Sequence, residues 1–135
     1  MGAWAEDAFG NDTACDWAAN FADDPGLEKV EEAIDSVIQS EDYLDADQAS
    51  ECLVACEIVA RLKGNWGTKN TYSEQIDKWV ESVQITPSSE LIDKSKNAIH
   101  KILGDDSELK ELWDEDGENK KWHNEINNLL ERVSN

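Results

Sequence analysis

The 135-residue chain has few of the residues that break or cross-link a fold. It contains only two prolines, seven glycines and three cysteines, which argues against a disordered, collagen-like or disulfide-stapled protein. No stretch approaches the roughly 18 apolar residues that a membrane-spanning helix needs. The longest apolar segment, residues 52–60, is interrupted by Glu57. What is left is a polar globular chain, long enough to bury one hydrophobic core.

Basic residues are also scarce. Lys and Arg number 12 against 31 Asp and Glu, which gives a net charge of −19. Residues 1–60 hold sixteen acidic residues and a single basic one, Lys29, and therefore carry −15 of this charge. Because phosphate groups are bound through Lys and Arg, we expect no direct binding to nucleic acid and none to anionic membranes. A basic protein partner, or solubility alone, remains to explain the charge.

The low, odd number of cysteines predicts a compartment as well as a fold. Three cysteines in a chain that can build its own core indicate free thiols in a reducing environment. No basic segment followed by an apolar one opens the chain, so we expect no secretory signal and a cytoplasmic protein.

Apolar residues recur with a period of 3.6 residues along almost the whole chain, which is typical of amphipathic helices. No strand pattern, repeat or linker interrupts this period. We therefore expect one all-α domain over residues 1–135, a compact bundle of six to seven helices. The expected helices cover about residues 12–22, 25–39, 45–63, 73–84, 88–103, 107–113 and 122–133.

The helices expected at 25–39 and 45–63 differ in their surroundings. The first is amphipathic, with an acidic outer stripe, and Asp24-Pro25 is a suitable N-cap and first turn for it. The second is apolar around nearly its whole circumference, which predicts a buried, central helix. Arg61 and Lys63 lie in its last turn, where positive charge is favourable, and Gly64 is expected to end it.

The acidic stripe and the loop after it form the candidate binding surface. If it is a docking face, it would bind a basic protein through steered association; the alternative is a solvated surface that only keeps the protein soluble. The predicted residues are Glu28, Glu31, Glu32, Asp35, Glu41, Asp42, Asp45 and Asp47.

No metal or cofactor site is expected. Asp114, Asp116, Glu118 and Glu125 match positions 1, 3, 5 and 12 of an EF-hand loop, but position 6 is Asn119 where glycine is required; we favour a solvated acidic turn. Cys52 and Cys56 share a helix face four residues apart, yet no second pair of ligands accompanies them. Buried cysteines that act as small apolar side chains are the simpler interpretation.

Tryptophan is abundant, with six residues. Those that coincide with apolar helix positions are expected in the core: Trp17, Trp79, Trp113 and Trp122. Trp4 and Trp66 lie outside the expected helices, and we interpret them as aromatics that cover the core rather than as binding anchors.

Nothing in the sequence points to catalysis. It has no glycine-rich phosphate loop and no nucleophile elbow, and acidic pairs are too numerous to be specific. We expect no enzyme and no catalytic residues. The alternative is a small-ligand-binding protein or enzyme that uses a pocket near the 64–72 loop.

The opening segment resembles a known bacterial family, catalogued as domain of unknown function 4259. The shared pattern M-G-x-W-x-x-x-x-F-x-N-D-x-x-x-D-W is met here by Gly2, Trp4, Phe9, Asn11, Asp12, Asp16 and Trp17. The stretches CLVACEIVARLKG, SELKELWDEDGENKKW and LLER are similar as well. The resemblance implies a small, bacterial, cytoplasmic helical domain, and it implies no activity and no functional residues.

Within this opening motif the residues have physical roles of their own. Trp4 and Phe9 are expected to pack back across the bundle, and Asn11 or Asp12 to cap the first helix. Asp16 falls on the polar side of that helix, so we expect it to be exposed; a buried hydrogen bond to the opening segment is the alternative.

Taken together, these features predict a small acidic binding protein that docks on a basic protein partner. Immunity proteins, which inhibit nuclease toxins in this way, are an analogy of charge and size. Mimicry of nucleic-acid charge is a related possibility.

Overall fold

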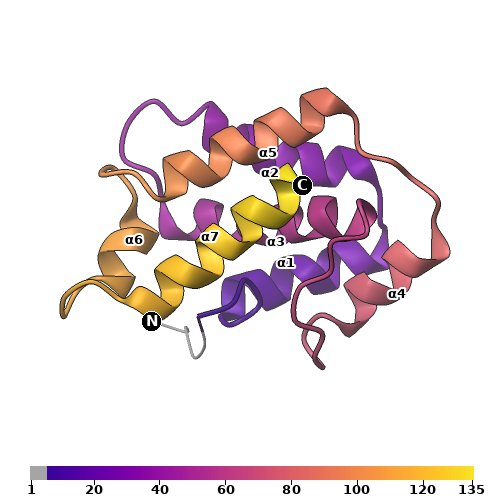
Figure 1. The fold of residues 1–135 in the computed structure, drawn as a ribbon, viewed down its shortest axis with the longest axis horizontal. Helices are drawn as coiled ribbons and strands as arrows, with labels where there is room; N and C mark the ends of the chain where they lie inside the picture. Colours follow the sequence, from indigo (N-terminus) through magenta and orange to yellow (C-terminus); the bar gives the residue numbers. More distant parts are fainter. Residues whose placement is uncertain (1–5) are drawn as a thin grey trace.

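The computed structural model describes residues 6–135 as seven helices, which account for 65% of this range (Figure 1). The only β pairing within it is a single bridge between Leu44 and Ser107. The expected all-α fold is therefore confirmed. The helices are α1 (Asp12–Asp23), α2 (Leu27–Ile38), α3 (Ala46–Leu62), α4 (Glu74–Ser82), α5 (Ser89–Ile102), α6 (Glu108–Trp113) and α7 (Lys120–Ser134).

Helix α3 is the centre of the bundle, as its sequence predicts. It contacts all six other helices, and Figure 1 shows it running behind α7 with the other helices around it. Leu53 is 3% exposed and Val59 is fully buried. Small side chains such as Ala55 and Cys56, also fully buried, allow the neighbouring helices to approach closely.

Polar side chains cap most of the helices at their N-termini. Asn11, Ser88, Ser107 and Asn119 each accept a hydrogen bond from the backbone N–H three residues later. Such a cap satisfies one of the N–H groups that the first turn leaves without a partner. These short polar residues, readable in the sequence, therefore fix where α1, α5, α6 and α7 begin.

Gly64 ends α3 as predicted. Its φ of +87° lies in the left-handed region that favours glycine. The N–H of Gly64 donates to the carbonyl of Arg61 at 2.9 Å, and the N–H of Asn65 donates to the carbonyl of Ala60 at 2.9 Å. This pair of bonds is a Schellman motif, which satisfies carbonyls at the end of the helix.

The predicted start of α2 is wrong by two residues. Its N-cap is Gly26 rather than Asp24, because Asp24 is used to end α1, with its N–H donating to the carbonyl of Phe21 at 3.2 Å. Pro25 therefore lies in the connection between the two helices and not in the first turn of α2.

The tryptophans are less buried than expected. Of the four assigned to the core, Trp122 is 1% exposed, whereas Trp17, Trp79 and Trp113 are only partly buried at its edge. Trp66 covers the core from its loop, as predicted. Phe9 is buried at 3% exposure, and Trp4 lies outside the described residues.

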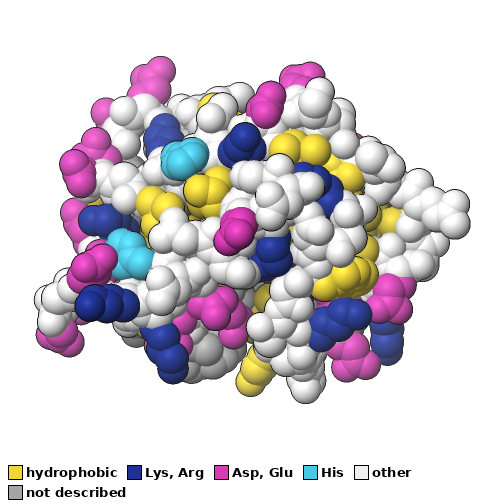
Figure 2. Space-filling model, in the orientation of Figure 1, with side chains coloured by type: hydrophobic (Ala, Val, Ile, Leu, Met, Phe, Trp, Pro, Cys, Tyr) yellow, Lys and Arg dark blue, Asp and Glu magenta, His cyan; other side chains and the backbone are white. Residues whose placement is uncertain are grey.

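No helix between residues 6 and 135 combines the length and the hydrophobicity needed to cross a membrane. The face formed by α5 and α7 mixes acidic, basic and apolar side chains (Figure 2).

Candidate functional site

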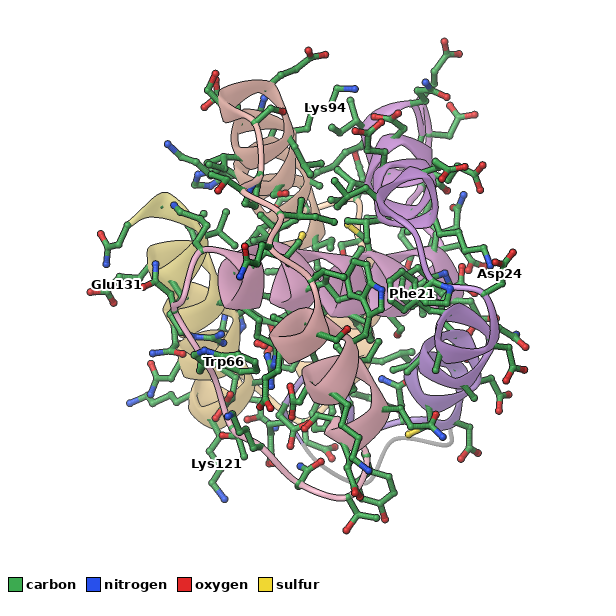
Figure 3. All side chains as sticks on the ribbon, turned by 90° about the vertical axis from the view of Figure 1, so that its right-hand side faces the viewer. Phe21, Asp24, Trp66, Lys94, Lys121 and Glu131 are labelled. Atoms are coloured by element: carbon green, nitrogen blue, oxygen red, sulfur yellow. The ribbon has the colours of Figure 1, made fainter. Side chains whose placement is uncertain are left out.

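The predicted acidic surface lies on α2, on the α2–α3 loop and at the start of α3. We use this name for the eight residues identified from the sequence. Seven of them are exposed, because α2 turns its apolar side towards α3 and α5 and leaves the acidic stripe in solvent. The exception is Asp35, half-buried and paired with Lys94 of α5 at 3.2 Å. In Figure 3 the labelled Lys94 lies on α5 beside α2.

Two members of the acidic surface also have structural roles. Asp45 caps α3 by accepting from the N–H groups of Asp47 at 2.8 Å and Gln48 at 3.2 Å. Asp47 accepts from the hydroxyl of Thr13 at 2.9 Å, which links α3 to α1. The remaining five exposed residues form no ion pair with any side chain in the 6–135 range.

A groove adjoins the acidic surface where α1, α2 and α3 meet. It has a volume of about 300 Å³, and its lining includes Trp17 and Phe21 of α1, Glu32 of α2 and Glu51 of α3. Burial, followed by the charges of Asp47 and Asp45, raises the pKa of Glu51. The groove therefore combines aromatic rings with carboxylates.

Sequence reasoning missed the groove. The 3.6-residue period predicts Trp17 in the core, but the residue packs only at the edge of the core and lines the groove. The available signal was the spacing of Asp47 and Glu51, four residues apart. They share one side of α3, where Asp47 is exposed and Glu51 is half-buried, so the neighbouring helices do not fully cover this side.

A buried charge network occupies the opposite end of α3. Arg61, only 1% exposed, donates from Nη1 to Glu57 Oε2 at 2.8 Å and from Nε to Asp77 Oδ1 at 2.7 Å. Its Nη2 donates to the carbonyl of Thr68 at 2.7 Å. Arg61 lies in the last turn of α3, as predicted, and its side chain turns inward, where it fixes α4 and the 64–72 loop.

Two further side chains complete the network. Arg132 of α7 donates from Nη2 to Glu57 Oε1 at 2.6 Å, and the hydroxyl of Ser73 donates to Asp77 Oδ2 at 2.8 Å. Two carboxylates and two guanidinium groups are thus paired, as buried charges must be. The network (Glu57, Arg61, Asp77 and Arg132) ties α3 to α4, α7 and the intervening loop.

Aromatic rings and one glycine shape the space around the two arginines. The Arg61 guanidinium lies 5.5 Å from the centroid of the Phe9 ring and 5.8 Å from that of Trp66, within the range of cation–π attraction. Gly67 passes so close to Arg132 that a Cβ there would lie 2.7 Å from its Nη1. Gly67 therefore lets the loop pass close to the end of the Arg132 side chain, which would otherwise have to shift.

A small cavity lies beside the 64–72 loop, where the alternative function was expected. It has a volume of about 270 Å³, and its lining includes Asp7, Glu57, Thr68, Glu125 and Arg132. Burial, followed by the charges of Asp7 and Glu57, raises the pKa of Glu125. The cavity is at the small end of the sizes found for ligand sites, and two of its charged groups already pair with each other.

The 114–119 turn is organised around a histidine. Asp114 receives hydrogen bonds from the Asn119 N–H at 2.9 Å and from His123 Nε2 at 2.9 Å. Although burial acts in the opposite direction, these two bonds hold the pKa of Asp114 below its usual value. Asp116 and Glu118 are exposed. No set of three potential metal ligands comes together in the part of the chain that the structure describes.

All three cysteines are free thiols. Cys52 and Cys56 are fully buried, with sulfur atoms 4.0 Å apart. The neighbouring thiol and burial raise the pKa of Cys52 well above its ordinary value, so it stays protonated and behaves as a small apolar group.

Asp16 of the opening motif is exposed, as expected.

Comparison with known proteins identifies one family. No curated protein and no solved structure shows a significant match to the chain. The model of one family, described as domain of unknown function (DUF4259), matches residues 2–125. This span includes the opening motif, α3 and α6, and the chain is therefore a member of the DUF4259 family.

Proposed function

We propose that the protein is a small acidic binding protein that docks on a basic protein partner through the acidic surface. The observation that carries the proposal is the pairing pattern of that surface. Seven of its eight carboxylates are exposed and have no ion-pair partner within residues 6–135, whereas Asp35 is paired with Lys94.

Charge of one sign gathered on one side of a protein steers an oppositely charged partner towards it. The first 60 residues, which include the whole acidic surface, carry −15 of the net −19. Arg61 at the far end of α3 does not offset this charge, since it is buried and paired with Glu57 and Asp77. The field of the acidic surface therefore extends into solvent.

The class of partner follows from this charge. A nuclease or another protein with a nucleic-acid-binding surface presents the Lys and Arg groups that such a field attracts. The protein would then act as an immunity or inhibitor protein, or as a mimic of nucleic-acid charge, inside a bacterial cell. Free cysteines fit the reducing cytoplasm of that proposal.

The cavity beside the 64–72 loop supports the alternative of a small-ligand protein or enzyme less well. Glu57 and Arg132 pair with each other, so neither charge is free to meet a ligand without breaking a bridge. We therefore propose binding rather than catalysis as the activity.

The test is the rate at which the partner associates. We expect replacement of Glu28, Glu31 and Glu32 by Lys to preserve the fold, since all three are exposed on the outer side of α2. With the partner purified by affinity capture, the association rate at low salt should fall about tenfold or more, the lower end of what steering supplies. The difference should shrink as salt is added.

A matched variant separates location from total charge. Glu115, Asp116 and Glu118, in the turn before α7, are also exposed, and their replacement by Lys changes the net charge by the same amount. We expect this variant to retain most of the association rate. Equal losses in the two variants, or a captured partner that is acidic or a small molecule, would contradict docking at the acidic surface.

A further inference from the structure

We propose that the groove between α1, α2 and α3 is the anchor point of this interface and receives an arginine side chain of the basic partner. The inference rests on the proposed function and deepens it, because it names one recognised group and one position. It depends on the groove's aromatic floor, its carboxylate rim and its place beside the acidic surface.

The floor of the groove is a rigid aromatic platform. Trp17 stacks on Phe21 with ring centroids 5.4 Å apart and an interplanar angle of 18°. Phe21, 1% exposed, is itself held by an edge-to-face contact with Trp79 of α4 at 5.0 Å. Figure 3 shows Phe21 inside the bundle and Asp24, in the connection between α1 and α2, at its outer edge. Because Trp17 is held in place before binding, a partner loses little entropy in ordering it.

The rim of the groove supplies negative charge from two helices. Glu32 of α2 and Glu51 of α3 both line it, and neither forms an ion pair with a residue in the 6–135 range. The one cation of the lining, Lys29, is directed to Asp24, with its Nζ 3.4 Å from Oδ2 of that residue. The carboxylates of the rim are therefore available to an incoming positive group.

The chemistry of the lining selects arginine among the possible occupants. A guanidinium group is planar and weakly hydrated, so it stacks on an indole face while its N–H groups bond to carboxylates. Its aliphatic stem can pack against Ala33, which also lines the groove. A lysine ammonium forms the ion pairs but stacks less well, and an anionic group would be repelled by Glu32 and Glu51.

The groove has the position expected of an interface centre. Glu32 belongs both to the groove and to the acidic surface, so the two are continuous. Binding energy at interfaces is concentrated in a few aromatic and arginine contacts, surrounded by polar residues that contribute little each. Here Trp17 is the aromatic contact, and the acidic surface adjoins the groove through Glu32.

The experiment measures binding of synthetic peptides to the full chain at low salt by calorimetry. The probes are a short peptide of alternating Gly and Arg, the same peptide with Lys, and the same peptide with citrulline, which has the shape of Arg without its charge. We expect the Arg peptide to bind more tightly than the Lys peptide and the citrulline peptide not to bind measurably.

Two variants locate the site. Trp17→Leu should weaken Arg-peptide binding about fivefold, the equivalent of one cation–π contact, and should abolish the preference for Arg over Lys. Glu51→Gln should weaken binding more than Glu118→Gln, which changes the net charge equally at a distant turn. Since Glu51→Gln removes no packing, it decides the question even if Trp17→Leu lowers the stability of the fold.

The outcomes separate this inference from the proposed function. If Arg and Lys peptides bind equally and Glu51→Gln matches Glu118→Gln, the groove is not the anchor, while charge-steered docking stands. If neither cationic peptide binds and no basic partner does, the proposed function is wrong and the groove with it. Once the partner is known, Trp17→Leu should increase its dissociation rate with little change in its association rate.

Discussion

Charge has opposite roles at the two ends of α3. Near its C-terminus, Glu57 and Arg61 belong to a network in which each buried carboxylate contacts a guanidinium group. Near its N-terminus, Asp45, Asp47 and their neighbours on α2 stand in solvent with almost no cationic partner. The same residue types are thus fully paired in one region and left unpaired in the other.

This difference indicates which charges serve the fold and which are available for binding. Buried charges that lose a partner are strongly destabilising, because the remaining ion can be neither solvated nor paired. Exposed charges contribute little to stability and are free to vary. The network should therefore respond to substitution through stability, and the acidic surface through association.

The largest expected effect is that of Arg61→Met. This change leaves Glu57 with only Arg132 and leaves Asp77 without a cation, so it should lower the free energy of unfolding by about 3–5 kcal/mol. That is a large share of the roughly 5–15 kcal/mol that stabilises a typical domain. Urea denaturation followed by circular dichroism measures it.

A second substitution checks the cause. If the loss comes from unpaired carboxylates rather than from lost packing, Asp77→Asn in the Arg61→Met background should restore part of the stability. An Arg61→Met protein as stable as the wild type would show that the network is not buried as described.

The sequence predicted local structure well and long-range pairing poorly. Asn11, Ser88, Ser107 and Gly64 mark helix ends because caps depend on residues within one turn. The position of Asp77 beside Arg61 depends on how the loop between α3 and α4 folds back, which no local rule contains. Glu57, the polar residue inside an apolar stretch, was the one signal of a buried pair.

The candidate site shows the same division. The exposure of the acidic stripe on α2 follows from its 3.6-residue period, and the structure agrees for three of its four residues, Glu28, Glu31 and Glu32. Asp35 differs because Lys94 reaches it from α5. Trp17 packs at the edge of the core rather than inside it, because periodicity identifies the apolar side of a helix but not the point where the neighbouring helices end.

A smaller loss of stability is expected for Gly67→Ala. The new methyl group would lie 2.7–2.9 Å from three atoms of the Arg132 guanidinium, so either the loop or the Arg132–Glu57 bridge must move. We expect a loss of about 1–2 kcal/mol, in the range of overpacked sites, measured by thermal unfolding. In an Arg132→Met background the same change should have much less effect; an undiminished loss would place the strain elsewhere.

Substitutions on the acidic surface should raise the stability of the fold rather than lower it. Replacing Glu28, Glu31 and Glu32 by Gln relieves repulsion, including that between Glu28 and Glu32, four residues apart on α2. We expect a gain of about 0.5–1 kcal/mol in the free energy of unfolding at low salt. The gain should fade at high salt because the repulsion is screened. A loss of stability would mean that these residues are paired after all.

The smallest expected effect on stability is that of Glu125, which is half-buried but has no ion-pair partner in the described residues. It lines the cavity with Glu57, but the structure gives it no ion pair of its own within residues 6–135. Burial, then Asp7 and Glu57, raise its pKa above the usual 4.5. A raised pKa in the folded state means that the ionised form is disfavoured there, so this group favours folding only while it is protonated. That contribution is complete below pH 4.5 and is lost as the pH rises through the folded-state pKa.

Glu125→Gln should therefore stabilise the protein at pH 7 by about a few tenths of a kcal/mol, as expected for a partly exposed charge, and should have no effect near pH 4. Unfolding curves across this range, with Glu131→Gln on the exposed side of α7 as the control, measure the difference. A benefit that persists unchanged at pH 4 would show that Glu125 is not held in an unfavourable ionised state.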